Sequence, residues 1–353
     1  MAKEALVEEK LLHLSVSPHL RDGVTVPKIM RSVVLALLPA LMGAVYFFGT
    51  RVLWLVLAGV VSAVLTEALC QKIRSRPITV SDGSAVVTGM LLVYCLPPGV
   101  PFWMPMVGSA FAIAIGKQAF GGLGHNPFNP ALLGRAFLLA SWPLHMTTDW
   151  RAPAMGSMSG IDAVTNATPL AVLKEAHKIL SDPVSTTEQM VRAREAIAQL
   201  SSSYGDLFFG NVGGSLGETS VILLLIGGLY LLFKRYIGWK IPLMFIGTVM
   251  LLTGAFGGTD GFLSGDVLFH LLSGGLILGA FFMATDMVTT PITFRGRLIF
   301  GAGCGVITSV IRLVGGYPEG VCYSILLMNA FTPLIDRWTK PKRLGEKPRG
   351  QAS

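Results

Sequence analysis

Ten apolar segments dominate the sequence, and they constrain the fold more than any other feature. Most are near the length needed to cross roughly 30 Å of hydrocarbon, although several are short or interrupted by glycine. Only 14% of the residues are charged, whereas soluble domains have about 25%. The sequence therefore predicts an all-α polytopic membrane protein with about ten transmembrane helices. The segments are residues 31–49, 52–71, 84–98, 102–120, 128–143, 219–233, 240–257, 265–285, 298–315 and 319–335.

The distribution of lysine and arginine predicts how these segments are oriented. Basic residues cluster in alternate connections, including residues 72–76, 234–240 and 295–297, and again after residue 336. The opposite short connections contain few, so the positive-inside rule assigns both termini to the cytoplasm. Because the basic residues lie beside apolar segments, the net charge of +8 reflects this rule and argues against a nucleic-acid partner.

These orientations divide the chain into five predicted parts. A cytoplasmic N-terminal segment covers residues 1–30, and a basic cytoplasmic tail covers residues 336–353. Two membrane units of five helices each cover residues 31–143 and 219–335. Between them, residues 144–218 form a polar extracytoplasmic loop region.

An internal repeat relates the two membrane units. "RPITVSDGSAVVTG" (76–89) parallels "TPITFRGRLIFGAG" (290–303). Each is followed by a stretch broken by glycine and proline, "GGLGHNPFNPALLGRAF" (121–137) and "GGYPEGVCYSILLMNAF" (315–331). Because five is an odd number of helices, two such units have opposite orientations, and inverted repeats with broken helices place binding sites near their pseudo-two-fold axis. The alternative is a chance match between short membrane sequences.

Six charged or titratable residues interrupt the apolar segments, where polar groups are costly. We interpret each alone as a structural, paired or interface-facing group rather than as part of an ion relay. Four of them are expected near helix ends with their charges snorkelling towards water, whereas His270 lies deeper and is expected to be satisfied by hydrogen bonds. The spacing of the histidines, cysteines and acids predicts no metal site. The six residues are Glu67, Lys117, Arg135, His270, Asp286 and Arg312, and the four expected to snorkel are Glu67, Lys117, Asp286 and Arg312.

The first broken stretch contains two asparagines three residues apart. Pro127 and Pro130 remove backbone donors just before a new helix begins. Asn126 and Asn129 offer amide donors and acceptors to a planar heterocycle, or alternatively they only cap the broken helix. The residues alone do not choose between these interpretations.

The polar region between the membrane units contains a helix start at Thr168. Threonine is a preferred N-cap residue and Pro169 suits the first helical position. Leu170, Leu173, Ile179 and Leu180 then follow one helical face. The N-terminus of a helix favours an anion, so a hydroxyl there is well placed to hold a phosphate or be esterified to one. A plain N-cap is the simpler interpretation.

Three long stretches resemble a known family. They are residues 17–49, "SPHLRDGVTVPKIMRSVVLALLPALMGAVYFFG"; residues 116–138, "GKQAFGGLGHNPFNPALLGRAFL"; and residues 316–336, "GYPEGVCYSILLMNAFTPLID". The chain resembles the D subunit of the Rnf complex and, more distantly, the B subunit of the Na+-translocating NADH:quinone reductase. The resemblance implies a membrane subunit that carries electrons between ferredoxin and NAD, in a complex that moves H+ or Na+.

The resemblance also implies a covalently attached FMN. In this family the flavin is joined by a phosphoester to the threonine that ends a D-x-x-(S/T)-x-A-T motif, and "DAVTNAT" matches this motif at residues 162–168. It therefore implies Thr168 as the attachment residue. It further implies Asp162, Thr165 and Ala167 as the elements recognised by the flavin transferase that forms the bond.

A second cofactor and the cellular setting follow from the same resemblance. Asparagines matching Asn126 and Asn129 lie beside a non-covalent riboflavin in the quinone reductase subunit, which implies a possible second flavin here. The implied partners are other Rnf subunits, the flavin transferase and the lipid bilayer. The implied location is the bacterial cytoplasmic membrane, with Thr168 on its outer side. Without the family resemblance, the inverted repeats would favour a secondary transporter or channel with no redox cofactor.

Overall fold

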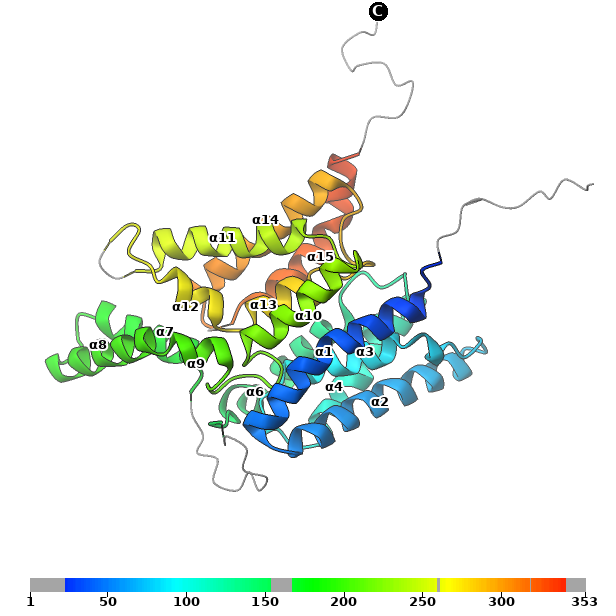
Figure 1. The fold of residues 1–353 in the computed structure, drawn as a ribbon, viewed down its shortest axis with the longest axis horizontal. Helices are drawn as coiled ribbons and strands as arrows, with labels where there is room; N and C mark the ends of the chain where they lie inside the picture. The colour runs from blue at the N-terminus through cyan, green and yellow to red at the C-terminus, as the bar shows by residue number, and fades with distance from the viewer. Residues whose placement is uncertain (1–22, 154–166, 259–260, 318, 341–353) are drawn as a thin grey trace, which may run out of the picture.

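The computed structural model describes residues 23–153, 167–258, 261–317 and 319–340, and every regular element within these residues is a helix (Figure 1). Among the described residues, three helices are long and apolar enough to cross a membrane, and four shorter ones are also apolar. The prediction of an all-α polytopic membrane protein is therefore confirmed. The three long helices are α1 (Val26–Phe48), α2 (Arg51–Ile73) and α14 (Phe294–Leu313), and the shorter ones are α3 (Ser84–Tyr94), α5 (Pro130–Ser141), α10 (Val221–Phe233) and α11 (Lys240–Phe256).

The first half of the molecule begins with two long helices, α1 and α2, and continues with shorter ones. Gly49, at φ +81°, turns the chain between α1 and α2. Helix α3 ends at Tyr94, shortly before Pro97 and Pro98, which lack the amide hydrogens that a helix needs. The hydroxyl of Tyr94 donates to the carbonyl of Leu37 at 2.8 Å, which ties the end of α3 to the middle of α1.

Two helices continue into π-helical turns, each formed by one extra residue per turn. Helix α4 (Trp103–Ile113) runs into η2 (Ala114–Gln118), and α13 (Leu276–Leu278) runs into η3 (Gly279–Met283). An irregular segment follows each, and then a helix capped by a polar side chain: Asn129 for α5 and Thr293 for α14. The predicted apolar segment 102–120 is therefore one helical stretch that ends in a π turn, whereas the segment 265–285 is interrupted at residues 273–275 between α12 and α13.

The two halves meet where α1 packs against α10. A side chain on Gly227 would lie 1.9 Å from the carbonyl oxygen of Ala36, so only glycine allows the two backbones to approach this closely. The main apolar core extends from this contact through both halves and includes Leu37, Leu224 and Phe281. The halves therefore form one packed body rather than two separate ones.

The polar region between the halves is largely helical where the structure describes it: α7 begins at the helix start predicted at Thr168, and two further helices follow that the sequence did not predict. Helices α7 and α8 pack together, and Figure 1 shows them projecting from the side of the molecule opposite the start of α1 and the end of α15 (Val321–Trp338). Leu170 and Leu173 of α7 join Leu207 of α9 and Phe269 of α12 in a small apolar cluster. The two projecting helices are α7 (Pro169–Ser181) and α8 (Thr187–Ser202). The remaining short elements are α6 (Pro143–Thr148), α9 (Tyr204–Phe209), α12 (Val267–Leu272) and the 3-10 turn η1 (Val80–Asp82).

Candidate functional site

Thr168 begins α7 as the sequence predicts. Its backbone is extended, and its side-chain Oγ1 accepts a hydrogen bond from the backbone N–H of Ala171 at 3.3 Å. Pro169 occupies the first helical position, where its missing N–H costs nothing. The predicted N-cap is confirmed, and it is a buried one, since only 4% of Thr168 is exposed.

Thr168 lines a small cavity of about 30 Å³ at the junction of α7, α9, α12 and the segment before α10. Two hydroxyls in its lining, those of Ser215 and Ser273, are buried and make no hydrogen bond. Two carboxylates, Glu218 and Glu319, also line it. Polar oxygen atoms from four separate segments therefore converge around the attachment residue that the family resemblance implies.

The other residues of the flavin motif are only partly visible. Ala167 precedes the N-cap and is exposed. Asp162 and Thr165 lie outside the described residues. The structure therefore describes the acceptor threonine and its cavity, whereas the recognition role of the motif stays a prediction.

A second, larger cavity of about 450 Å³ follows the buried face of α7 beyond Leu170. Its lining includes Lys174, whose Nζ donates to the carbonyls of Ile311 at 3.4 Å, Tyr317 at 2.8 Å and Gly315, and so caps the C-terminus of α14. Burial lowers the pKa of Lys174, and burial likewise lowers the pKa of His177 one turn further along. Lys174 therefore fixes α7 against the membrane helices.

Arg312 and His270 also line this cavity, and both differ from expectation. Arg312 is only 4% exposed and donates to the carbonyls of His270 at 2.6 Å, Ser273 at 2.9 Å and Gly274 at 3.0 Å. The expectation that it snorkels to water was wrong, because α12 and the segment directly after it cover it. His270 is 3% exposed with both ring nitrogens lacking a hydrogen bond, so the expectation of a satisfied histidine was also wrong.

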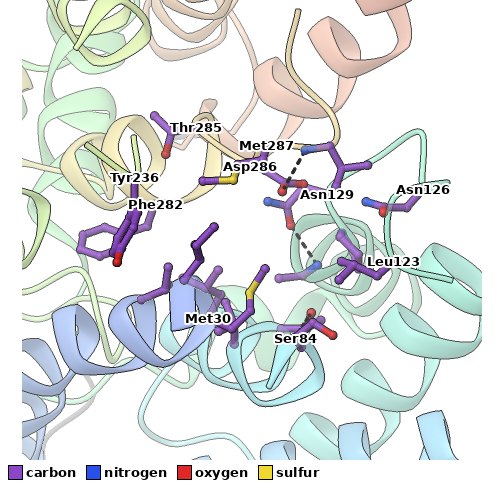
Figure 2. A pocket seen from close by; sticks show the side chains of 18 of the residues that line it. Met30, Ser84, Leu123, Asn126, Asn129, Tyr236, Phe282, Thr285, Asp286 and Met287 are labelled. Atoms are coloured by element: carbon purple, nitrogen blue, oxygen red, sulfur yellow. Dashed lines mark hydrogen bonds between the residues drawn. The ribbon is translucent and has the colours of Figure 1, made fainter. Parts of the chain in front are cut away.

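A third cavity, of about 350 Å³, lies inside the bundle between the two halves (Figure 2). Asn129 caps α5 by accepting from the N–H groups of Ala131 at 3.0 Å and Leu132 at 3.4 Å, and it donates to the carbonyl of Met283 at 3.2 Å. Asn126 donates to the carbonyl of Phe128 at 3.1 Å, but its Oδ1 has no partner. Both asparagines line the cavity, so capping and ligand binding are compatible for this pair.

Asp286 also lines this cavity and follows η3, and Figure 2 shows it beside Asn129. Its carboxylate accepts from the N–H of Val288 at 3.4 Å and the hydroxyl of Thr289 at 3.2 Å. The side chain is partly buried and satisfied locally. It therefore adds a polar group to a cavity whose lining is otherwise mostly apolar.

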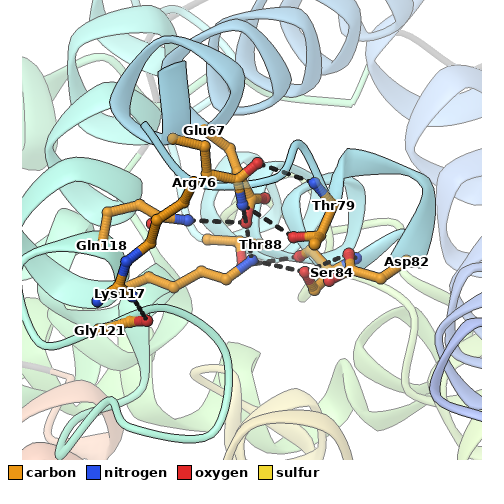
Figure 3. A network of polar contacts seen from close by, with 10 residues as sticks. Glu67, Arg76, Thr79, Asp82, Ser84, Thr88, Lys117, Gln118 and Gly121 are labelled. Atoms are coloured by element: carbon orange, nitrogen blue, oxygen red, sulfur yellow. Dashed lines mark hydrogen bonds and ion pairs between the residues drawn. The ribbon is translucent and has the colours of Figure 1, made fainter. Parts of the chain in front are cut away.

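Glu67 and Lys117 form a buried ion pair beside the same cavity. Their charged atoms lie 2.6 Å apart, and each side chain is only 1% exposed. Lys117 also donates to Ser84 at 2.6 Å, while Gln118 and Gln71 donate to Glu67 at 2.9 and 3.4 Å (Figure 3). The expectation of snorkelling was wrong for both charges, and the interpretation as a paired structural group is confirmed.

Arg135 forms the second buried pair, with Glu319. This pair joins α5 in the first half to the segment before α15 in the second. It confirms the structural interpretation of Arg135, and it brings Glu319 to the edge of the Thr168 cavity. The two halves are therefore linked by charge as well as by packing.

Comparison with known protein families decides the membership of the chain. The sequence model of the NQR2, RnfD, RnfE family matches residues 13–345. The chain belongs to this family. The match includes the Thr168 cavity and the cavity that Asn126 lines.

Curated members of the NQR2, RnfD, RnfE family are similar to this chain over nearly its full length. The D subunit of the proton-translocating ferredoxin:NAD(+) oxidoreductase complex of Clostridium ljungdahlii is 51% identical over 98% of this chain and 99% of its own. The D subunit of the Na(+)-translocating complex of Acetobacterium woodii is 48% identical, over 96% and 97%. The D subunit of the ion-translocating oxidoreductase complex of Stutzerimonas stutzeri is 43% identical, over 93% and 94%.

Several residues that line the Thr168 cavity were not predicted from the sequence. Ser215 and Glu218 lie in "NVGGSLGETS", a glycine-rich polar run directly before an apolar segment. Such a run was a usable signal, because irregular backbone near a membrane persists only where protein or a cavity satisfies it. Ser273 and Glu319 carried no such signal, since only folding brings them to the cavity.

Proposed function

We propose that this chain is the D-type membrane subunit of an Rnf-type complex, passing electrons between ferredoxin and NAD in a complex that moves H+ or Na+. The observation that carries this proposal is the 51% identity, over almost the whole of both chains, to a subunit of a ferredoxin:NAD(+) oxidoreductase. The subunit contributes to an oxidoreductase but holds only part of its machinery. Its partners are the other Rnf subunits and the lipid bilayer.

FMN is attached through a phosphoester to Thr168 in this proposal. The hydroxyl lies at the N-terminus of a 13-residue helix, whose dipole favours an anion. The unpaired hydroxyls of Ser215 and Ser273 in the same cavity are donors that suit phosphate oxygens. A cavity of about 30 Å³ is too small for a flavin ring, so the ring extends beyond it.

The bound flavin supplies the redox chemistry, and the chain supplies its placement. Thr168 fixes the phosphate end, and the anchoring of α7 by Lys174 keeps that end in a constant position relative to the membrane helices. Asp162, Thr165 and Ala167 serve the flavin transferase during maturation. These roles follow from the family motif together with the buried N-cap.

The cavity between the halves holds a second, non-covalent flavin, riboflavin. Its volume of about 350 Å³ lies in the range of small-molecule sites. The unpaired Oδ1 of Asn126 is an acceptor that faces an otherwise mostly apolar lining, as a heterocycle N–H requires. Asn129 holds the neighbouring helix start in place.

The membrane arrangement consists of about ten spans in two inverted five-helix repeats. The matching π turns η2 and η3, each followed by an irregular segment and a capped helix, support the repeat. Both termini are cytoplasmic and Thr168 is on the outer side of a bacterial cytoplasmic membrane. The position of α7 opposite the start of α1 and the end of α15 supports this sidedness (Figure 1).

A denaturing gel tests the attachment. The full chain is expressed together with a flavin transferase, and flavin fluorescence is read in the gel, where only covalent flavin remains. Thr168→Val is expected to lose all fluorescence. Thr186→Val is the matched control, because Thr186 caps α8 in the same region, accepting from Gln189 N–H at 3.3 Å, and is expected to keep it.

Two results would contradict the proposal. Fluorescence that survives in Thr168→Val would move the attachment to another residue. A wild-type protein without fluorescence, although the transferase is active on another substrate, would remove the covalent cofactor and favour the transporter or channel interpretation.

A further inference from the structure

The cavity beneath Thr168 has an unusual polar lining for its size. Every side chain in it that carries a polar atom carries oxygen and no nitrogen: the carboxylates of Glu218 and Glu319 and the hydroxyls of threonine and serine. Carboxylate and hydroxyl oxygens are the ligands of hard cations. The chemistry of the lining therefore suits a cation, also beside a phosphate, because a hydroxyl that donates to a phosphate oxygen still offers lone pairs to a cation.

Two of these oxygens are unpaired although they are buried. Ser273 is 4% exposed and Ser215 is fully buried, and neither Oγ makes a hydrogen bond. Ser215 faces Glu218, but outside ordinary hydrogen-bond geometry. A buried hydroxyl without a partner is destabilising because its lost hydration is not replaced, so both serines point to a ligand that the protein chain does not supply.

Of the two carboxylates that line the cavity, Glu218 has no ion-pair partner among the described residues. Glu319 is engaged by Arg135, and Arg312 directs its donors to three backbone carbonyls. No described cation lies within ion-pair distance of Glu218. Burial, and next the charge of Glu319, raise the pKa of Glu218 to about 7, against the opposite effect of the charges of Arg135 and Arg312. A single cation at this carboxylate would relieve that repulsion.

The volume limits what can occupy the space. About 30 Å³ is room for one or two water-sized bodies, since roughly 10–15 Å³ accommodates one. A single uncommitted carboxylate also favours a monovalent ion, because Ca²⁺ and Mg²⁺ sites usually draw on several carboxylates or phosphates. The occupant is therefore small, carries one charge and needs oxygen ligands.

We propose that this cavity binds one small monovalent metal cation, of the size of Na+, between Glu218, Ser273 and Ser215. Glu319 and the Thr168 hydroxyl complete the oxygen lining. The ligands belong to the chain itself, so the site exists without flavin and does not rest on the proposed attachment. Where a phosphoester is present at Thr168, the cation offsets its negative charge beside the two carboxylates.

The test uses the full chain purified in detergent after expression without a flavin transferase, so that Thr168 is free. Its thermal unfolding is followed in NaCl, KCl, MgCl₂ and choline chloride at equal ionic strength, above pH 8 where Glu218 is ionised. We expect a saturable rise in unfolding temperature with Na+ and a smaller rise with K+. The unfolding temperature in MgCl₂ should equal that in choline chloride. Binding to the native state alone produces such a rise.

Variants assign the effect to the cavity. Glu218→Gln is expected to abolish the Na+ response, and Ser273→Ala to weaken its apparent affinity about tenfold. Glu175→Gln, which removes an exposed carboxylate from α7, is the matched control and is expected to respond like the wild type. Because Ser273→Ala removes only one oxygen, it reports on the site even if Glu218→Gln fails to fold.

Several outcomes would overturn the proposal. They are equal responses to Na+ and choline in the wild type, a response to Mg²⁺ alone, an Na+ response that Ser273→Ala leaves unchanged, and a stability that depends on pH but not on any metal cation. The last of these would mean that a proton, rather than a metal ion, occupies Glu218.

Discussion

The cavity at Thr168 and the cavity at Asn126 are built in opposite ways. The outer one is about 30 Å³, lined by oxygen atoms and centred on one threonine in a contiguous motif. The inner one is about 350 Å³, mostly apolar, and assembled from α1, α3, η2, α5, α10 and η3 (Figure 2). The first can hold one end of a covalent cofactor, and the second can enclose a whole heterocycle.

Because the two cavities are built differently, a change at the inner cavity should affect both stability and ligand binding, whereas a change at the outer cavity should affect mainly ligand binding. The outer site rests on a helix cap and on Lys174, which contacts the end of α14. The inner site lies against the buried pair Glu67–Lys117, so its wall is part of the folded core. Changes in the outer site should therefore affect the ligand more than the fold, and changes beside the inner site should affect both.

The largest expected effect on stability comes from breaking the inner pair. Lys117→Met leaves the carboxylate of Glu67 buried without its cation and is expected to destabilise the protein by about 3–5 kcal/mol. The control is Arg192→Met, which breaks the exposed pair with Glu188, each 75% exposed, and should cost less than about 1 kcal/mol. Unfolding of both variants in denaturant measures the difference.

A double variant shows whether the pair itself is responsible. Glu67→Leu combined with Lys117→Met removes both charges and should recover most of the lost stability. Equal losses in the single and double variants would mean that packing around Lys117, rather than the unpaired charge, maintains this wall of the cavity.

A smaller effect is expected for the ligand of the inner cavity. Asn126→Ala removes the unpaired Oδ1 and should weaken riboflavin retention about tenfold, equivalent to one hydrogen bond. The riboflavin released on denaturation of the purified chain measures it. Covalent flavin at Thr168 should be unchanged in this variant, and Thr168→Val should in turn keep its riboflavin. Loss of both flavins in either variant would contradict the separation of the two sites.

The smallest expected effect is a pH dependence at the outer cavity. Glu218 has a pKa of about 7 when folded, above the ordinary value of 4.5. The folded protein therefore binds the proton more tightly, and stability falls as pH rises from about 4.5 to 7 in the absence of a metal cation. Glu218→Gln should reduce the slope of the unfolding free energy against pH by an amount that corresponds to at most one bound proton. A slope identical to that of the wild type would show that Glu218 does not titrate in this window.

The two regions also differ in how much of them the sequence could predict. Thr168, Pro169 and the apolar face of α7 are neighbours in the chain, so local rules were sufficient to predict the helix cap, although not its burial. Hydropathy likewise predicted the all-helical membrane fold. It could not predict the π turns or the helices α8 and α9 that follow α7, because these depend on packing between distant segments.

The three mistaken expectations of snorkelling share one physical cause. Glu67, Lys117 and Arg312 lie near the ends of apolar stretches, and such positions suggest snorkelling to water. In the folded chain other segments cover them, and each finds partners far away in sequence, such as Lys117 for Glu67 and the His270 carbonyl for Arg312. Position along one helix says nothing about the segments that pack across it.

The π turn η2 determines whether the Glu67–Lys117 pair beside the inner cavity can form. Lys117 lies within a turn that holds one residue more than an α-helix would. Deleting one residue ahead of it would restore the α-helix and rotate the residues on one side of the deletion by about 100° relative to those on the other. Lys117 would then point away from Glu67, with hydropathy and charge almost unaltered. The length of this segment is therefore as much a part of the site as the identity of its residues.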